Sequence, residues 1–198
     1  SLAAQGNNIF AGTFSNGVYY SANNGATWFQ TPLNSQNVWS MAVNGNFAFA
    51  GTFGLYLSTN NGTSWTQTLF GQYVYSLAIN GNNVFCGTGN GVFLSTDNGT
   101  GWTQTTLQNR EIDALTTNGD NVYAGAYFYG VFFSPDNAVT WYFTNLDNQN
   151  IKSLAVTGNN IFAGTNNSGV FVSNDNGVNW IQRNEGLTSF EINSLCIL

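Results

Sequence analysis

The 198-residue chain is long enough to bury a sizeable core, and 42% of its residues are hydrophobic, but only 6% are charged. Its net charge of −6 includes only three Lys and Arg side chains, too few to neutralise a nucleic-acid backbone or to hold an anionic membrane surface. No apolar run approaches the ~20 residues of a membrane span, so we expect neither nucleic-acid binding nor membrane insertion.

Five similar segments follow one another along the chain. They begin with SLAAQGNNIFAGT (1–13), SMAVNGNFAFAGT (40–52), SLAINGNNVFCGT (76–88), ALTTNGDNVYAGA (114–126) and SLAVTGNNIFAGT (153–165), which align without gaps. Each continues into a run like GVFLS, an eight-residue box such as STDNGTGW (95–102), and a variable tail. A fragment of a sixth copy, INSLCIL, covers 192–198. A repeat of roughly 36 to 40 residues indicates a repeat architecture.

Each repeat predicts four short strands. In the third repeat, the strands SLAIN and NVFCGT flank Asn80-Gly81, a dipeptide typical of tight hairpin turns. GVFLS is the third strand after a variable loop, the box turns the chain, and its tryptophan starts the fourth strand, WTQTT. Helical periodicity is absent, and the only prolines, Pro32 and Pro135, fall in turns or loops.

Four antiparallel strands in a unit of about 40 residues are the signature of a β-propeller. A β-sandwich does not require five alike units, and a β-solenoid usually has shorter, parallel rungs. We therefore expect an all-β chain that forms one domain over 1–198, a five-bladed β-propeller. Its blades should cover approximately 1–37, 38–73, 74–111, 112–150 and 151–190, with 191–198 as a closing strand.

Two segments compete for the closing position. Residues 1–4 and 194–198 both match the first strand of the same blade, and only one can take the innermost place. The C-terminal segment can bury more apolar surface through Leu195, Ile197 and Leu198, so we expect it to close the ring. We expect a monomer, unless the displaced segment associates with the edge of another chain.

The residue types of the box suit a tight turn. An Asp or Asn oxygen accepts backbone N–H groups within the turn, the Gly adopts a positive φ without strain, and the Trp covers the hairpin. This pattern, Ser-x-Asp-x-Gly-x-x-Trp, resembles the Asp-box, or bacterial neuraminidase repeat, of sialidase-like propellers. The resemblance covers essentially the whole chain. It implies that the boxes are structural turns between the third and fourth strands, on the face opposite the ligand site. The box residues are Asn23, Trp28, Asn60, Trp65, Asp97, Trp102, Asp136, Trp141, Asp175 and Trp180.

Two departures from the family pattern carry expectations. The first two boxes have Asn where the family prefers Asp, so the boxes should not bind calcium, and we expect neither a metal ion nor a cofactor. The fourth box, SPDNAVTW, has Ala138 in place of the Gly and Pro135 beside it. This turn should be the most strained or the most irregular.

Sialidase chemistry is excluded, because that family places three arginines around the substrate carboxylate and this chain has two, Arg110 and Arg183. No histidine is present, which removes the commonest general base. An alternative site is the pair Glu111 and Asp113, whose side chains would share one face of a strand about 6.6 Å apart, near the spacing of inverting glycosidases. Carboxylates on one strand cannot easily flank a sugar. We therefore expect no enzyme, and charges that meet Arg110 and Lys152 are the simpler interpretation.

The variable segments indicate a binding face. The tails before each first strand and the loops between second and third strands differ among repeats, and in a propeller they share one face. That face would gather aromatic side chains, including Phe14, Phe53, Phe70 and Phe128, which either cap the core or suit a glycan or a protein loop. The candidate ligand-binding residues are Trp39, Tyr73, Tyr75, Asp113, Lys152, Tyr127 and Tyr129.

Three functions stay open at this point. The resemblance favours a non-enzymatic binding or scaffold module, lectin-like, of a secreted or cell-surface bacterial protein. A glycoside hydrolase that uses Glu111 and Asp113, and an architectural spacer, are the alternatives. The two cysteines, Cys86 and Cys196, fall where other repeats have Ala, so both are expected in the core. A disulfide has little support, because the two lie on different strands of different repeats.

Overall fold

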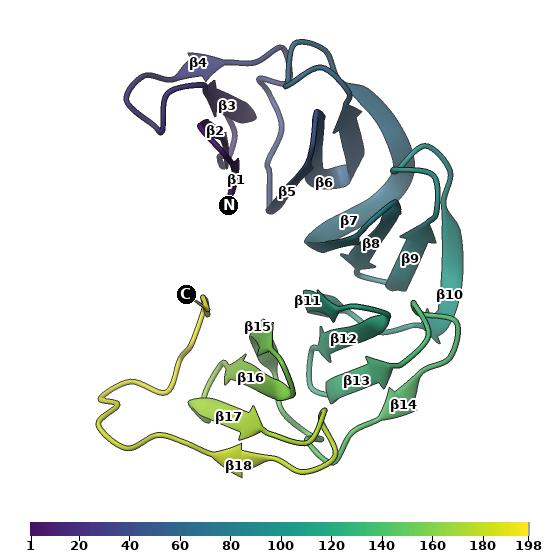
Figure 1. Cartoon of the computed structure of the whole chain (residues 1–198), viewed down its shortest axis with the longest axis vertical. Coiled ribbons are helices and arrows are strands. Elements are labelled where there is room, and N and C mark those ends of the chain that lie inside the picture. Colours follow the sequence, from purple (N-terminus) through teal and green to yellow (C-terminus); the bar gives the residue numbers. More distant parts are fainter. Residues whose placement is uncertain (198) are drawn as a thin grey trace. The chain divides into compact units, whose positions relative to one another are not determined.

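The computed structural model describes residues 1–197, and all of the regular structure in them is β-strand. Within these residues, no helix has the length and hydropathy needed to cross a membrane. The strands form sheets of four, six, four and four members, in which neighbours follow the chain order (Figure 1). The residues group into two compact units: 1–86 with 95–103, and 87–94 with 104 onward.

The strands follow the repeats. The first sheet contains β1 (Leu2–Gln5), β2 (Asn8–Gly12), β3 (Val18–Ser21) and β4 (Phe29–Gln30). The six-stranded sheet contains β5 (Ser40–Asn44), β6 (Phe47–Ser58), β7 (Thr66–Asn80), β8 (Asn83–Thr88), β9 (Gly91–Ser95) and β10 (Thr103–Gln108). The third sheet contains β11 (Ile112–Asn118), β12 (Asn121–Ala126), β13 (Gly130–Ser134) and β14 (Tyr142–Phe143). The last contains β15 (Ile151–Thr157), β16 (Asn160–Thr165), β17 (Val170–Ser173) and β18 (Ile181–Gln182).

The first, fourth and fifth repeats each form the expected four-stranded antiparallel sheet. In the second repeat, the expected boundary between the second and third strands is wrong, because β6 runs through both. The loop there is short, and register shifts between Phe53 and Gly54 and between Leu55 and Tyr56 let β6 pair first with β5 and then with β7. Likewise β7 runs from the fourth strand of the second repeat into the first strand of the third.

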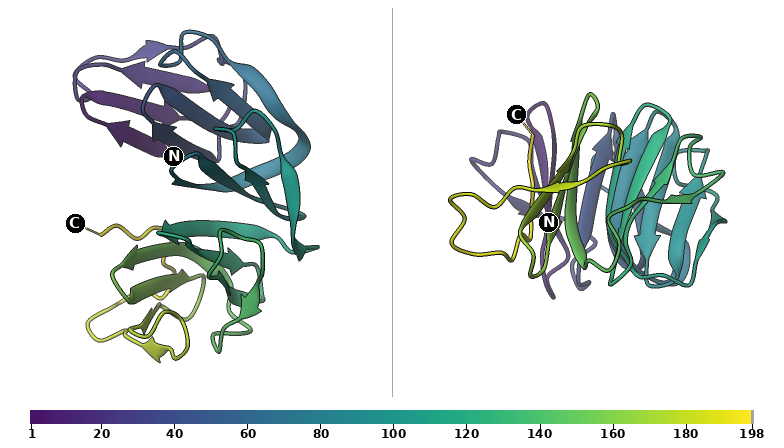
Figure 2. Two further views of the ribbon diagram at one scale, coloured as in Figure 1. Left: turned by 45° about the vertical axis from the view of Figure 1, so that its right-hand side comes forward. Right: turned by 90° about the horizontal axis from the view of Figure 1, so that it is seen from below.

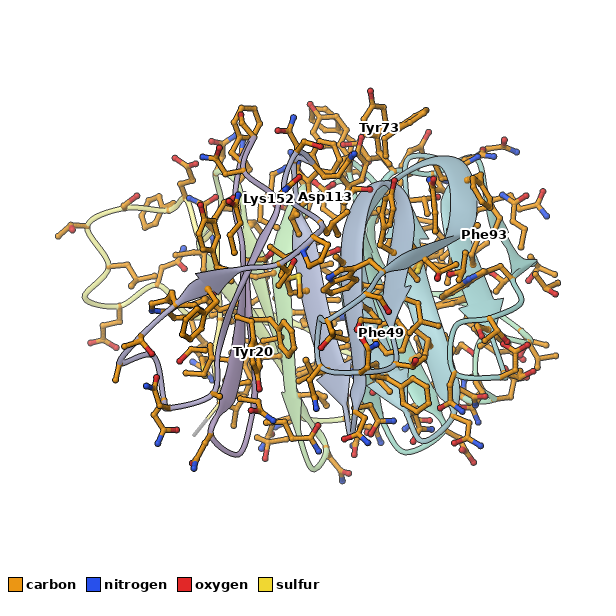
Figure 3. The ribbon with its side chains drawn as sticks, turned by 90° about the horizontal axis from the view of Figure 1, so that it is seen from above. Tyr20, Phe49, Tyr73, Phe93, Asp113 and Lys152 are labelled. Atoms are coloured by element: carbon orange, nitrogen blue, oxygen red, sulfur yellow. The ribbon has the colours of Figure 1, made fainter. Side chains whose placement is uncertain are left out.

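In the first unit, successive repeats bury one apolar layer between them. The layer contains Phe10, Val18, Leu33, Val38, Met41, Ala48 and Ala50, with Tyr20 and Trp65 packed against it. Tyr20 lies midway along the strands, whereas Tyr73 of the same unit lies at their end (Figure 3). Apolar residues on both faces of a strand, as in NIFAG, are therefore explained by repeats stacked on one another.

The second unit repeats this packing with different residues. Its layer contains Ala114, Tyr123, Val131, Leu146, Ile151, Ile161 and Ala163. In both units, a glycine of one repeat allows a side chain of the next repeat to approach its backbone closely. A Cβ on Gly12 would lie 2.4 Å from Cγ1 of Val38, and a Cβ on Gly125 would lie 2.4 Å from Cγ2 of Ile151. The Gly of the AG dipeptide therefore provides the space for the β-branched residue of the next repeat.

The expectation that the C-terminal segment takes the innermost place is wrong. β1 pairs with β2, from Leu2 opposite Ala11 to Gln5 opposite Asn8, and residues 191–197 form no strand. A two-residue hairpin costs less loop-closure entropy than a strand brought from the far end of the chain, which favours the adjacent β1. Leu198, which that expectation also used, lies outside the described residues.

The C-terminal segment is anchored in its own unit instead. The Ile192 N–H donates to the Thr165 carbonyl at 2.8 Å, and a Cβ on Gly164 would lie 2.6 Å from Cγ2 of Ile192. Because residues 193–197 form no strand, Cys196 is exposed, and its expected core position is wrong. Cys86 is buried as expected, and both cysteines are free thiols.

All five boxes form the same hydrogen-bonded turn. In the first, the Ser21 hydroxyl accepts from Gly25 N–H at 2.9 Å and donates to Asn23 Oδ1 at 2.9 Å, and Asn23 Oδ1 accepts from Thr27 N–H at 2.9 Å. In the third, Asp97 Oδ1 accepts from Gly101 N–H at 2.8 Å in the same way. One acceptor oxygen suffices for this bond, so Asn serves as well as Asp.

The fourth box is strained as expected. Ala138 has a φ of +69°, where the other boxes have a Gly at between +79° and +87°, and it is 2% exposed. The tryptophans cover the turns less completely than expected, since Trp28 is 40% exposed and Trp102 is half-buried.

Candidate functional site

The two kinds of connection lie at opposite ends of the strands, as predicted. At one end, the box turns bind the hairpins, for example from Asn24 N–H to the Asn7 carbonyl at 3.1 Å. At the other end, loops bind tails, as from Tyr127 N–H to the Glu111 carbonyl at 2.9 Å. Figure 2 shows the strands of each sheet side by side, with the connections at their ends. The variable segments of each repeat therefore gather at one end, which we call the loop end.

A β-bulge at the start of the first strand in the fourth and fifth repeats aims one side chain at the loop end. The register of β11 shifts between Ile112 and Ala114, and that of β15 between Ile151 and Ser153, which leaves Asp113 and Lys152 outside the paired ladder. Trp39 precedes the first strand of the second repeat in the same way. Its N–H donates to the Gly51 carbonyl at 2.9 Å, and Gly51 pairs with the next residue, Ser40. Bulges commonly re-aim a side chain in this way.

The first unit carries an aromatic cluster at its loop end. We define it as Trp39, Phe53, Tyr73 and Tyr75. The Trp39 and Tyr73 ring centroids lie 5.2 Å apart, edge to face, and those of Tyr73 and Tyr75 lie 6.1 Å apart and stacked. Phe53 lies 4.7 Å from Tyr73. Phe53 and Tyr73 are about half exposed, whereas Trp39 and Tyr75 are less so, and the cluster therefore offers a supported apolar surface to solvent.

The second unit carries a charged cluster at the equivalent positions. Lys152 Nζ lies 2.7 Å from Asp113 Oδ2, and the two side chains lie next to each other in Figure 3. Lys152 Nζ also lies 5.5 Å from the centroid of the Tyr127 ring. The predicted residues Asp113, Lys152 and Tyr127 are thus brought together, and the expected ion pair is present.

Arg110 was not among the residues predicted to bind a ligand. Its guanidinium carbon lies 4.1 Å from the centroid of the Tyr129 ring, within the range of a cation–π contact. A feature of the sequence could have indicated Arg110 as a candidate. Arg110 and Lys152 are two of the three cationic side chains of the chain, and both lie near the start of a first strand. Only the fold shows that Arg110 meets the loop of the next repeat.

Glu111 differs from an ordinary surface carboxyl. Burial raises its pKa, the negative charge of Asp113 raises it further, and Lys152 opposes the shift. The bulge at Asp113 breaks the regular alternation on which the expected spacing of this pair depended. Asp113 is paired with Lys152, and Glu111 lies close enough to both for their charges to act on it.

Both clusters are exposed surfaces at the loop end. A hollow of about 220 Å³ in the second unit is lined partly by the box residues Asn176, Gly177 and Val178, so it belongs to the box end. An exposed aromatic surface suits a ligand that lies across it.

Solved structures resemble this chain over nearly its full length. An ancestral GH74 enzyme is 24% identical, with a TM-score of 0.80 over 96% of this chain and 32% of the enzyme. The fold is a β-propeller fold. The extracellular domain of a putative hybrid two-component system from B. thetaiotaomicron is 22% identical, with a TM-score of 0.77 over 95% of this chain and 28% of that one. YCF48 bound to D1 peptide is 18% identical, with a TM-score of 0.69 over 96% of this chain and 67% of YCF48.

The propeller therefore spans about a third of the length of the first two of these proteins. No protein-family model matches the chain. No curated protein matches it either. The identities are all below 25%, so the comparisons concern the fold of the propeller and leave its ligand open.

Proposed function

We propose that the chain is a non-enzymatic binding module of a secreted or cell-surface bacterial protein, built as a five-bladed Asp-box propeller. Five sequence repeats and five turns with one hydrogen-bond pattern support the blade count and the Asp-box assignment. The boxes serve as structure, because their polar groups are used within the turn. The ligand binds at the loop end.

The aromatic cluster carries this proposal. Three rings pack around Tyr73, yet Tyr73 and Phe53 are 46% and 53% exposed. An exposed aromatic surface of this kind indicates an interaction site, since exposed rings stabilise the fold less than buried ones. The flat apolar faces of sugars and the side chains of a protein loop both fit such rings, and each stacked ring contributes on the order of 1 kcal/mol.

The neighbours are consistent with a module at a cell surface. One of them is an extracellular domain of a sensor protein, and others are GH74 enzymes. In this chain, the scarcity of charge and the abundance of Asn, Thr and Ser agree with an extracellular setting.

A glycoside hydrolase is the second candidate, because the pKa of Glu111 is raised by partial burial and by Asp113, which is the direction that a general acid requires. The pairing of Asp113 with Lys152 speaks against it, since a carboxylate held by an ammonium group at 2.7 Å is not free to activate a water molecule. An architectural spacer, the third candidate, would bind nothing.

A glycan array and a set of chromogenic glycosides, applied to the purified chain, separate the three functions. Binding without turnover is the expected result. The dissociation constant of a captured glycan is then measured for Trp39→Ala, which should weaken binding by about fivefold or more. Asn60→Ala is the matched control, because it removes a box hydrogen bond to Ser64 N–H at 2.9 Å and should lower stability while leaving affinity unchanged.

Turnover that disappears in Glu111→Gln would replace the proposal with the hydrolase. A captured ligand whose affinity depends on Asn60 and not on Trp39 would place the binding surface at the box end and refute the assignment. A partner protein whose binding depends on Trp39, with no glycan bound, would retain the module and identify a protein as its ligand.

A further inference from the structure

We propose that Arg110, together with the Tyr127–Tyr129 loop, binds the carboxylate of an acidic sugar, a uronic-acid residue of a polysaccharide. This inference rests on the proposed binding function and assigns a ligand class to the loop end of the second unit. It adds Arg110 and Phe128 to the candidate binding residues.

The Arg110 guanidinium is oriented but not neutralised. It is held 4.1 Å above the Tyr129 ring, and Nη1 donates to the neighbouring Asn109 carbonyl at 3.0 Å. Its Nε is buried and has no hydrogen-bond partner, and among residues 1–197 the one ion pair is that of Lys152 with Asp113. Since a guanidinium presents five donors in a plane, the outer Nη groups have capacity for a carboxylate. Stacking on Tyr129 restricts the side chain before a ligand binds.

The middle residue of the loop beside Arg110 has a strained backbone conformation. Phe128 has a φ of +61°, in the left-handed region that bulky side chains avoid, and it is 61% exposed. Its ring packs edge to face on Tyr127, with centroids 4.3 Å apart. Gly or Asn at this position would remove both the backbone strain and the exposed phenyl ring. Strain of this kind gathers at binding sites, and here it sets an apolar ring beside a cation.

The surrounding charges select the ligand class. Glu111 and Asp113 lie in the same cluster, and the whole chain carries a net charge of −6. A dianionic phosphate or a dense polyanion would be repelled, whereas one carboxylate can pair with Arg110. The phenol groups of Tyr127 and Tyr129, and the Glu111 carboxyl, can exchange hydrogen bonds with hydroxyl groups. A ring that carries one carboxylate and several hydroxyls matches this set better than an acidic peptide does.

The probe is a disaccharide that contains a single uronic-acid residue, with its methyl ester as the matched ligand. Calorimetry at low ionic strength should detect the acid form binding roughly tenfold more tightly than the ester. Arg110→Gln should abolish that difference. Arg183→Gln, which removes an exposed cation and changes the net charge equally, should retain it. Phe128→Ala should weaken both forms.

Equal affinity of the two forms for the unchanged chain, or equal effects of the two arginine variants, would overturn the proposal. A tripeptide that ends in glutamate and binds through Arg110, while the disaccharide does not bind, would also overturn it in favour of a peptide ligand. The proposed function fails separately: it is refuted if no glycan or protein binds anywhere on the chain. A neutral glycan bound through Trp39, without any response to Arg110→Gln, would refute only the present inference.

Discussion

Lys152 and Asp113 occupy the same bulge position in successive repeats, and Lys152 Nζ lies 2.7 Å from Asp113 Oδ2. In the first unit, Trp39 and Tyr75 have the corresponding places, and their ring centroids lie 6.1 Å apart. The residue that precedes the first strand therefore makes a side-chain contact between the second and third repeats and between the fourth and fifth repeats. The residue type at that position decides whether the contact is ionic or aromatic.

The ion pair should contribute modestly to stability. The Lys152 and Asp113 side chains are 30% and 12% exposed, so screening by solvent is partial. We expect a coupling free energy of about 0.5–1 kcal/mol in a double-mutant cycle with Lys152→Met and Asp113→Asn, measured by urea unfolding. Additive effects of the two substitutions would mean that the pair does not stabilise the fold.

Ala138→Gly should stabilise the fourth box by about 1 kcal/mol, because it relieves a left-handed φ of +69° in a residue with a side chain. The matched control is Gly62→Ala, which creates the same strain and sets a Cβ 2.9 Å from Cε1 of Phe10. Thermal unfolding should show a higher Tm for the first variant and a lower Tm for the second. A lower Tm for both would show that the buried methyl group of Ala138 matters more than its backbone strain.

Trp102→Ala should lower the free energy of unfolding by about 2 kcal/mol, which is less than for a fully buried tryptophan. The side chain is half-buried, and its Nε1–H donates to Thr68 Oγ1 and to the Gly99 carbonyl, both at 3.2 Å. Trp28→Ala, at the 40% exposed equivalent, should cost less. An unchanged denaturation midpoint for Trp102→Ala would contradict the structural role of the box.

The Asp boxes should weaken in acid and the Asn boxes should not. Backbone N–H bonds from Gly101, Thr140 and Asn179 lower the pKa values of Asp97, Asp136 and Asp175, respectively. A lowered folded pKa means that the stabilisation is fully present above the unfolded pKa of about 3.9 and is lost as the pH falls through the folded value. The triple variant Asp97→Asn, Asp136→Asn and Asp175→Asn should therefore lose less stability between pH 7 and pH 2 than the parent chain. Parallel pH profiles of the two proteins would disprove this.

A chain that ends at Ile192 should melt at the same temperature as the full chain. Residues 193–197 form no strand, whereas Ile192 packs beside Gly164 and binds the Thr165 carbonyl. Ile192→Ser should therefore lower the Tm, and deletion of residues 1–5 should lower it as well, because it removes the partner of β2. A large loss of stability on truncation after Ile192 would restore the C-terminal segment as the closing strand.

The sequence alone determined the repeat, the strands and the turns, because these depend on local chemistry. Asn80-Gly81 and the Ser-x-Asp/Asn box carry their turn geometry within a few residues, so five copies predict five hairpins and five box turns. The strain at Ala138 was predictable for the same reason. The gathering of variable segments at one strand end also followed from the order of the strands, and the structure brings Trp39 next to Tyr75 and Asp113 next to Lys152.

The tertiary structure decided the features that depend on partners distant in sequence. The place beside β2 is taken by the adjacent β1, which loop-closure entropy favours over a segment nearly the whole chain away. The exposure of Cys196 follows from that outcome. The stacking of Arg110 on Tyr129 depends on how the tail of one repeat meets the loop of the next, and no local pattern encodes that distance. The strands and turns are local, whereas the candidate binding residues meet only when repeats pack together.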